Sequence, residues 1–442
     1  MKTILLAGGQ SKRVKPIADK CFVKICGKTL IEWQLGALKK AGFDQLVIVG
    51  NAMNLEKLKH VQVEGMQIEV VEQTDLQAGM KGAMEAAREA VINEDQIMVV
   101  SSNDVVEDGL WENVKRKTEN EKDNAGFFVG YKVTRYFPGG YLKLDEKGFV
   151  STIVEKPGEG NEPSDLVNLV IHVHRDVKAF YKALDEVVPS TPGPLKGEKI
   201  PPPDDLYERA LQKLFDEQKK YSVLGYDGFW QAVKYPWHLL RLMEFYLEKI
   251  ERSVSKKAQI APTAVVNGKV VIEEGVRVFD HSVINGPAYI GKDSIVGNFA
   301  LVRGSSLGEK CVAGSFTEIA RSLLQDEVWT HKNYVGDSII GSNVSFGSGT
   351  VTGNLRLDEG DISVMVSGEK VDSRRNKLGL ITGDNIRVGV NSSFMPGVKV
   401  GSNSMIGAEL NIAQDIEENS YVKGSGSQLD IRQNQKGVGR RG

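Results

Sequence analysis

Glycine and basic residues stand close together at the start of the chain, in an order that suits phosphate binding. The apolar run Ile4–Ala7 leads straight into Gly8 and Gly9, and a polar turn with Arg13 follows. Glycines directly after a strand let backbone N–H groups approach an anion, and an arginine adds a forked donor for phosphate oxygens. The run is neither a P-loop nor a dinucleotide fingerprint, because the further glycines of those motifs are missing. Taken alone, it leaves phosphate binding and an ordinary strand–turn–helix connection equally open.

His172 and His174 alternate on one predicted strand and therefore share a face. A metal site is one interpretation of this pair. No third ligand is found by spacing, which favours a packing or hydrogen-bonding role.

Composition narrows the classes of function. A chain of 442 residues suggests two or three domains, and 41% hydrophobic with 26% charged residues is typical of a soluble protein. The net charge of −2 gives no reason to expect nucleic acid as a partner. No run approaches the roughly 20 apolar residues of a membrane span, and the N-terminal run is too short for a signal peptide. Three widely spaced cysteines, Cys21, Cys26 and Cys311, indicate a reduced, cytoplasmic protein.

Residues 1–250 alternate predicted strands and helices. Strands are expected at 4–7, 45–49, 68–71 and 96–100, and helices at 28–40 and 82–91. The alternation predicts an α/β domain with a mostly parallel sheet and helices on both faces. Ligands of such sheets bind beyond the carboxyl ends of the strands, where both the glycine turn and Asp104 are expected.

A strand-rich part closes this domain. Strands are expected at 126–133, 140–144, 150–154 and 166–173, and helices at 204–218 and 237–250. Between them, residues 189–203 form a Pro-, Gly- and Lys-containing loop whose length suggests a lid or an insertion.

A different repeat begins near residue 260. Aliphatic residues recur at every sixth position in two series, with a looser series between them: Ile260, Val266, Ile272, Val278, Ile284, Ile290, Val296 and Val302; Val388, Phe394, Val400, Ile406 and Ile412; and Tyr334, Ile340, Phe346 and Thr352. This period is typical of a β-helix, in which each short strand contributes one inward side chain. A purely structural stacking role is an equally open interpretation. Residues 355–380 interrupt the repeat and are expected to project as a loop.

These patterns predict three segments. They are an N-terminal domain at 1–250, a β-helix at 251–428 and a basic, disordered tail at 429–442.

The first domain resembles the sugar-1-phosphate nucleotidyltransferases, a Rossmann-like family, over about residues 1–250. Its motifs occur here in one order: Leu6-Ala-Gly-Gly-x-Ser-x-Arg13-x-x-Pro16, Lys20, Glu72-Gln73, Gly79-x-x-Gly82-Ala83, Asn103-Asp104, Gly140, Glu155-Lys156-Pro157, Asn168, and Gly228-Phe-Trp230 to Pro236-Trp237. The resemblance implies that a sugar 1-phosphate attacks the α-phosphorus of UTP or dTTP and expels pyrophosphate. The sugar would be N-acetylglucosamine 1-phosphate or glucose 1-phosphate.

The resemblance also implies a role for each motif. Arg13 and Lys20 would be the catalytic cations that neutralise the triphosphate, and Asp104 would hold Mg²⁺. The nucleotide would contact Gly8, Gly9, Gln73, Gly79 and Gly82, with the Gln73 amide reading a pyrimidine edge. The sugar would contact Gly140, Glu155, Lys156 and Asn168.

Two positions depart from that family's pattern. Ser11 stands where glycine is usual, a change that related molybdenum-cofactor nucleotidyltransferases tolerate. Ala232 stands where a second metal-binding aspartate is common, and alanine cannot ligate a metal. Either Asp104, phosphates and water hold the ion, or the domain is weakened or inactive.

The C-terminal half resembles the left-handed β-helix acyltransferases, and most of all the bifunctional enzymes that make UDP-N-acetylglucosamine, with their archaeal relatives. The motifs are His331-Lys-Asn-Tyr334-Val-Gly-Asp337, Gly347-Ser-Gly-Thr350 and Asn354-Leu-Arg-Leu-Asp358. The resemblance implies that His331 deprotonates a sugar amine for attack on acetyl-CoA, that Tyr334 and Asn354 orient the sugar, and that the chain forms a homotrimer.

This half also departs from its relatives. Where the archaeal enzymes carry two lysines, this chain has Gly360 and Ser363, with Lys370 as the nearest cation in the sequence, and Ser345 stands where an asparagine is usual. Two hypotheses therefore stay open: a nucleotidyltransferase that also acetylates glucosamine 1-phosphate, and a regulatory or assembly subunit that binds nucleotide sugars without turnover.

Overall fold

The chain, described by a computed structural model over residues 1–188, 206–425 and 428–433, forms two compact units. One unit comprises Met1–Gln10 and Ile31–Ala232, and the other comprises Ser11–Leu30 and the described part of Val233–Gly442. This partition differs from the predicted boundary at residue 250. Helix α7 (His238–Lys249) groups with the C-terminal half because it contacts β2 (Lys24–Ile25) and β26 (Leu323–Leu324). The predicted loop at 189–203 lies outside the described residues.

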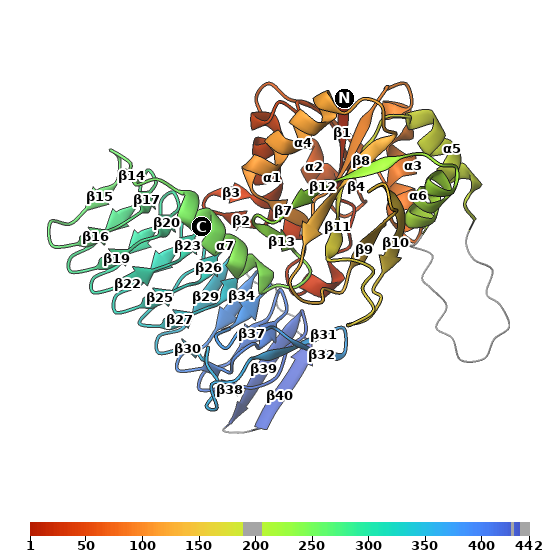
Figure 1. Cartoon of the computed structure of the whole chain (residues 1–442). Coiled ribbons are helices and arrows are strands. Elements are labelled where there is room, and N and C mark those ends of the chain that lie inside the picture. Colours follow the sequence, from red (N-terminus) through yellow and green to blue (C-terminus); the bar gives the residue numbers. More distant parts are fainter. Residues whose placement is uncertain (189–205, 426–427, 434–442) are drawn as a thin grey trace. The chain divides into compact units, whose positions relative to one another are not determined.

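A nine-stranded sheet forms the centre of the first unit (Figure 1). Its parallel half consists, in spatial order, of β5 (Gln67–Glu72), β4 (Gln45–Gly50), β1 (Lys2–Leu6) and β6 (Ile97–Ser101). Its other half consists of β11 (Leu166–His174), β8 (Gly126–Lys132), β9 (Gly140–Leu144), β10 (Val150–Glu155) and β12 (Tyr221–Tyr226). The prediction of a parallel sheet holds for the first half. In the strand-rich part, β11 pairs antiparallel with β6, β8 and β9, and β9 pairs antiparallel with β10, to which a short turn connects it.

Helices cover both faces of this sheet, as the alternation of elements predicts. Ile4, Val47 and Val99 share one core with α3 (Gly79–Val91), α5 (Val177–Glu186) and α6 (Leu206–Asp216). The alternate residues Leu5, Ile48 and Val100 point to the opposite face and are buried as well. The remaining helices of this unit are α1 (Leu30–Lys40), α2 (Leu55–Lys59) and α4 (Asp108–Asn120).

The second unit contains a left-handed β-helix of short parallel strands on three faces (Figure 1). One face runs from β14 (Ser253–Val254) to β36 (Lys399–Val400), and another from β16 (Val265–Asn267) to β38 (Asn411–Ile412). The third face begins at β15 (Gln259–Ile260) and ends in β39 (Ser420–Ser425), with only isolated bridges at Trp329. The predicted β-helix is confirmed.

The repeat of six places its aliphatic side chains in one continuous core, which includes Ile284, Ile290 and Phe394. Between the two long series the step shortens to five at Val302–Leu307, Ile319–Leu324 and Val335–Ile340. The looser series therefore misplaced one member: Val335 is the buried residue, whereas Tyr334 is half-exposed.

The interruption at 355–380 is a hairpin, β31 (Ser363–Val366) and β32 (Glu369–Asp372), rather than an irregular loop. Ile362 and Val364 are buried, and a Cβ at Gly397 would lie 2.7 Å from the Ile362 side chain. The hairpin is therefore held against the β-helix by close packing at Gly397. At the C-terminus, β40 (Gln428–Gln433) pairs antiparallel with β39, so this part of the predicted tail is a strand. Residues 434–442 lie outside the described residues.

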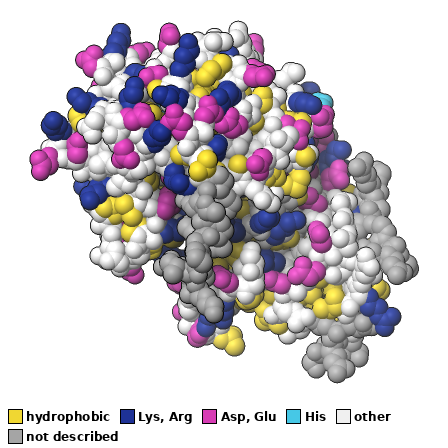
Figure 2. Space-filling view, turned by 90° about the vertical axis from the view of Figure 1, so that its right-hand side faces the viewer, with side chains coloured by type: hydrophobic (Ala, Val, Ile, Leu, Met, Phe, Trp, Pro, Cys, Tyr) yellow, Lys and Arg dark blue, Asp and Glu magenta, His cyan; other side chains and the backbone are white. Residues whose placement is uncertain are grey.

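Positive and negative side chains are interspersed over the face seen in Figure 2, which agrees with the small net charge. In the described ranges, no helix combines the length and the apolar character that a membrane crossing needs.

Candidate functional site

Gln73 brings together the glycines predicted to bind the nucleotide. Its Nε2 donates to the backbone oxygens of Asp75 at 2.9 Å and Gly79 at 2.8 Å. A Cβ at Gly82 would lie 2.5 Å from the Asp75 backbone oxygen and 2.9 Å from Gln73 Nε2, so glycine is required there, and a Cβ at Gly8 would lie 2.9 Å from Gln73 Oε1. Both Nε2 hydrogens are thus engaged by protein carbonyls, which leaves the acceptor oxygen as the part of this amide suited to a base edge.

Two buried asparagines hold the glycine turn from the neighbouring strand end. Asn51 Nδ2 donates to the Gly8 carbonyl at 2.8 Å, and Asn54 Nδ2 donates to the Ala7 carbonyl at 2.9 Å. These contacts engage the carbonyl oxygens, which would otherwise repel an anion. Nothing lies within 4 Å of the position that a Cβ on Gly9 would occupy. Neither asparagine was predicted as a site residue, although Asn51 directly follows β4 at the ligand edge of the sheet.

Asp104 begins a short strand at the same sheet edge, β7 (Asp104–Val106), which pairs antiparallel with β13 (Trp230–Ala232). The Trp230 indole donates to Asp104 Oδ1 at 2.8 Å. Gln34 Nε2 donates to the backbone oxygens of Ser102 at 3.1 Å and Asp104 at 3.3 Å. Trp230 therefore holds the Asp104 carboxylate, and Gln34 holds its backbone.

Ala232 lies directly opposite Asp104 in this pairing and is buried. Directly opposed residues have Cβ atoms about 5 Å apart, so an acidic side chain here would stand beside the Asp104 carboxylate. No three His, Cys, Asp or Glu side chains come together as metal ligands in the part of the chain that the structure describes. One carboxylate fits Mg²⁺ in the mode in which substrate phosphates and waters complete the shell.

The predicted sugar residues lie on the antiparallel half of the sheet. Gly140 pairs with Glu155, and a Cβ at Gly140 would lie 2.4 Å from Glu155 Oε1, so glycine lets this side chain cross the neighbouring strand. Glu155 and Lys156 are exposed, and Lys156 adopts a left-handed backbone with φ 45°. Asn168 Oδ1 lies 3.0 Å from His172 Nε2, so His172 orients the Asn168 amide.

The histidine pair is part of a buried aromatic cluster, which confirms the predicted hydrogen-bonding role. His172 Nδ1 lies 2.8 Å from the Tyr207 hydroxyl, and His174 Nδ1 lies 3.0 Å from the Tyr221 hydroxyl. Burial lowers the pKa of His174 to about 3. Burial, with His174 as a like-charged neighbour, also lowers the pKa of His172 well below its ordinary value.

The two predicted catalytic cations belong to the second unit. Arg13 is exposed within a single turn of 3-10 helix, Lys12–Val14. Lys20 is buried at 8% exposure, and its Nζ donates to the Val233 carbonyl at 3.3 Å. Lysine is seldom so buried without a specific reason, which marks it as a candidate functional side chain.

On the β-helix, His331 lies exposed in the turn before β27 (Tyr334–Gly336). Asn333 holds this turn: its Oδ1 accepts from the His331 amide at 2.5 Å, and its Nδ2 donates to the carbonyls of Gly347 at 2.8 Å and Thr350 at 2.9 Å. The structure thus brings the first two acyltransferase motifs into direct contact. Asn333 was not predicted as a site residue, because its contacts join segments that are separated in the sequence.

A polar network joins the other residues of these motifs. Asn354 Nδ2 donates to the Tyr334 hydroxyl at 3.2 Å and also to Asp337 Oδ2. Asp337 is buried and accepts two hydrogen bonds from Arg321, at 2.7 and 2.6 Å. A Cβ at Gly336 would lie 2.5 Å from the Tyr334 hydroxyl, so this glycine lets the phenol reach Asn354.

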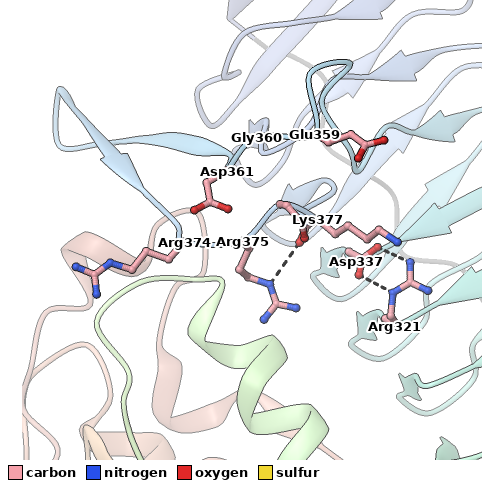
Figure 3. Close-up of a pocket in the computed structure, with 9 residues that line it drawn as sticks. Arg321, Asp337, Glu359, Gly360, Asp361, Arg374, Arg375 and Lys377 are labelled. Atoms are coloured by element: carbon pink, nitrogen blue, oxygen red, sulfur yellow. Dashed lines mark hydrogen bonds and ion pairs between the residues drawn. The ribbon is translucent and has the colours of Figure 1, made fainter. Parts of the chain in front are cut away.

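A pocket of about 660 Å³ opens beside this network (Figure 3). Its lining residues are Arg321, Asp337, Glu359, Gly360, Asp361, Arg374, Arg375, Asn376 and Lys377. Arg375 is held by Glu244 at 3.1 Å, and Arg374 points away from the Arg321–Asp337 pair in Figure 3. Lys377 extends toward that pair and forms no ion pair within the described residues.

Lys377, rather than Lys370, is thus the lysine of the insertion that lines this pocket. Gly360 does line the pocket, but Ser363 is paired with Asp372 in the hairpin. Lys370 is exposed on β32, opposite Met365, and is not part of the pocket lining.

Comparisons with known proteins cover both units. A family profile described as nucleotidyl transferase matches residues 2–230. The chain is 33% identical to the bifunctional protein GlmU of Methanocaldococcus jannaschii, over 96% of this chain and 97% of that protein. It is 30% identical to a bifunctional sugar-1-phosphate nucleotidylyltransferase/acetyltransferase of Sulfurisphaera tokodaii, over 96% of this chain and 100% of the relative. A bifunctional protein GlmU of Clostridium novyi is 23% identical over 97% of both chains.

Proposed function

Because this chain belongs to the nucleotidyl transferase family, in its branch of bifunctional nucleotidyltransferase/acetyltransferases, we propose that it activates a hexose 1-phosphate with UTP or dTTP and acetylates glucosamine 1-phosphate. The observation that carries the proposal is similarity over 96% of the chain to a relative whose name gives both activities, and to a second relative that is named as bifunctional. Acetylated product of the β-helix could then serve as a sugar substrate of the first unit.

In the first step, a phosphate oxygen of the sugar 1-phosphate attacks the α-phosphorus, and the bond to the leaving pyrophosphate breaks. Catalysis of this step consists mainly of in-line positioning and charge neutralisation. Amides at Gly8 and Gly9 would bind phosphate oxygens, with Arg13 and Lys20 as cations. Glu155 and Asn168 would hold the sugar hydroxyls. His172 would keep the Asn168 amide in the orientation that this role needs.

Asp104 would hold Mg²⁺ together with the phosphates of the substrate. When bound, the ion neutralises charge on the triphosphate. The Trp230 indole and the Gln34 amide, which fix Asp104 and its backbone, would act as positioning groups.

In the second reaction, His331 would accept a proton from the sugar amine while the nitrogen attacks the acetyl carbonyl carbon. The carbon–sulfur bond then breaks, and coenzyme A leaves as the thiol after taking up a proton. Tyr334 and Asn354 would orient the sugar, and Lys377 and Arg321 would attract its phosphate. The exposed position of His331 at a turn suits access by a large acyl donor.

A panel of UTP and dTTP with glucose 1-phosphate and N-acetylglucosamine 1-phosphate in Mg²⁺ buffer tests the first activity by release of pyrophosphate. Acetyl-CoA with glucosamine 1-phosphate tests the second by release of the free thiol. We expect His331→Ala to abolish thiol release and to leave pyrophosphate release within twofold of wild type. Absence of pyrophosphate from every pairing would refute the first activity, and thiol release by His331→Ala would refute the role of His331.

Ala232 favours a second candidate, a nucleotide-sugar-binding subunit without turnover, because it leaves one carboxylate where two could stand. This candidate predicts that UTP or a UDP-sugar binds in calorimetry while no pairing in the panel turns over. Turnover that disappears in Asp104→Asn would rule it out.

A further inference from the structure

The segment Ser11–Leu30, here called the strap, carries Arg13 and Lys20 and lies against the β-helix within the second unit. Its regular pieces are two single turns of 3-10 helix, Lys12–Val14 and Lys20–Phe22, and the small hairpin of β2 with β3 (Lys28–Thr29). A segment with so little structure of its own takes its conformation from the surface that it contacts.

One β-helix face supplies that surface. Gln325 pairs with the strap backbone in both directions: its Oε1 accepts from the Lys24 amide at 2.9 Å, and its Nε2 donates to the Lys24 carbonyl at 3.0 Å. The Lys24 ammonium lies 2.8 Å from Asp326 and 3.4 Å from Glu309. The next contact is the Cys26 amide, which donates to Ser306 Oγ at 3.0 Å.

The strap follows this face across several coils. Ser306 is registered beside Tyr289 in one neighbouring strand and beside Leu323 in the other. A Cβ at Gly27 would lie 2.2 Å from the Tyr289 hydroxyl, and Gly27 has φ +79°, so glycine is required twice over. At its other end, the Pro16 carbonyl lies 3.1 Å from the position of a Cβ on Gly383. The strap is thus held by hydrogen bonds at Lys24 and Cys26 and by close packing at Gly27, and it also approaches the β-helix backbone at Pro16.

We propose that this face of the β-helix positions the cationic loop of the nucleotidyl-transfer reaction, with Lys24, Gln325 and Asp326 as the positioning residues. The inference rests on the proposed function, because it assigns Arg13 and Lys20 to the triphosphate. On this inference, the rate of nucleotidyl transfer depends on side chains of the β-helix, the domain proposed to carry the acetyl-transfer reaction. Lys20 lies only four residues from Lys24, so a shift at Lys24 moves the buried ammonium.

The cysteines of the chain report strap docking independently of activity. Cys21 and Cys26 are buried in the strap, and Cys311 is fully buried inside the β-helix. Burial raises the pKa of the Cys26 thiol to about 12, so a docked strap gives little reactive thiolate. Release of the strap should expose two thiols and leave the third protected.

The test compares Lys24→Ala/Gln325→Ala with wild type in the full-length protein. We expect two thiols to react with a disulfide reagent, and kcat/KM for UTP in pyrophosphate release to fall at least tenfold, since small misplacements of charged groups are costly. The KM for N-acetylglucosamine 1-phosphate and the rate of thiol release from acetyl-CoA should stay within twofold. Lys24→Arg, which keeps the charge, should retain most of the wild-type kcat/KM for UTP. Glu274→Gln, which removes ion pairs elsewhere on the β-helix, should leave this value unchanged.

Two results would overturn the inference. One is a double variant with reactive strap thiols and an unchanged kcat/KM for UTP, because the strap would then be free without loss of catalysis. The other is a double variant whose thiols stay protected, because the strap would then be held by other contacts. If wild-type protein releases no pyrophosphate with any pairing of the panel, the proposed function fails instead, and the thiol assay still decides whether Lys24 and Gln325 hold the strap.

Discussion

At the scale of single residues, the Mg²⁺ site proposed for the first reaction contains one carboxylate. The Trp230 indole holds the Asp104 side chain, and the Gln34 amide holds the Asp104 backbone. The residue across the strand pair is Ala232. If Asp104 binds Mg²⁺ as proposed, the remaining ligands are expected to come from substrate phosphates and water.

Ala232→Asp tests this interpretation by adding the missing carboxylate. We expect the Mg²⁺ concentration for half-maximal pyrophosphate release to fall about fivefold or more, because a second hard ligand raises affinity for the ion. Titration of initial rates with Mg²⁺ gives this value. Ala232→Asn, similar in size but uncharged, is the control for steric effects at this buried position. Equal Mg²⁺ requirements in Ala232→Asp and wild type would contradict a site at this strand pair.

The buried histidines make stability depend on pH. The pKa of His174 is lowered to about 3, and that of His172 is also lowered, while an unfolded histidine titrates near 6.5. Between these values the unfolded chain binds more protons than the folded one. The stabilisation is thus complete above about pH 6.5 and falls on acidification by up to about 1.4 kcal/mol per pH unit for each histidine.

We therefore expect His174→Gln to flatten the fall in thermal midpoint between pH 6.5 and pH 5, although it lowers the midpoint at pH 7. Circular dichroism melts at several pH values measure this slope. His60→Gln serves as the control, since His60 is exposed and should keep the wild-type slope. Parallel slopes for the two variants would show that His174 does not carry the acid sensitivity.

At the scale of elements, the insertion that contains the hairpin of β31 and β32 contributes residues to the pocket beside the acyltransferase motifs. The chain after the hairpin returns to the β-helix through Arg374 to Lys377, which line the pocket beside the Tyr334–Asn354 network. The insertion thus brings Lys377 to this pocket, although this residue lies outside the motifs on which the resemblance rests.

Lys377→Ala should raise the KM for glucosamine 1-phosphate in thiol release about tenfold and leave pyrophosphate release unchanged, because it removes one charge from the phosphate-binding side of the pocket. Lys370→Ala is the matched control: it removes a lysine of the same insertion that is not in the pocket lining. A larger effect from Lys370→Ala than from Lys377→Ala would contradict the assignment.

Patterns with a local cause could be predicted from the sequence, and contacts between distant segments could not. The period of six identified the β-helix because each inward residue is set by its own strand. The five-residue steps escaped prediction, since a turn can lose one residue without changing the aliphatic composition, and Tyr334 was assigned in place of Val335 for this reason. Asn51, His172 and Lys377 were missed as site residues because their roles arise from tertiary contacts.

At the scale of the whole molecule, an aromatic column on one corner of the β-helix bears on assembly. Phe299 stacks on His281 and on Phe316, with ring centroids 5.1 Å apart in both pairs. Phe299 is 51% exposed and Phe316 is 63% exposed. Exposed aromatic surface of this kind is often used for association, so we take the column as the candidate contact between chains.

We expect the wild-type chain to form a trimer, as its resemblance to β-helix acyltransferases implies, and Phe316→Asp to dissociate it, because a buried carboxylate without a partner is costly. Light scattering after size-exclusion chromatography should give three times the chain mass of 48.5 kDa for wild type and a single chain mass for the variant. Leu357→Asp, the same change at a fully exposed residue of the insertion, should remain trimeric. A wild-type monomer would contradict the trimer. A trimer that survives Phe316→Asp at low micromolar concentration would show that the column is not at the interface.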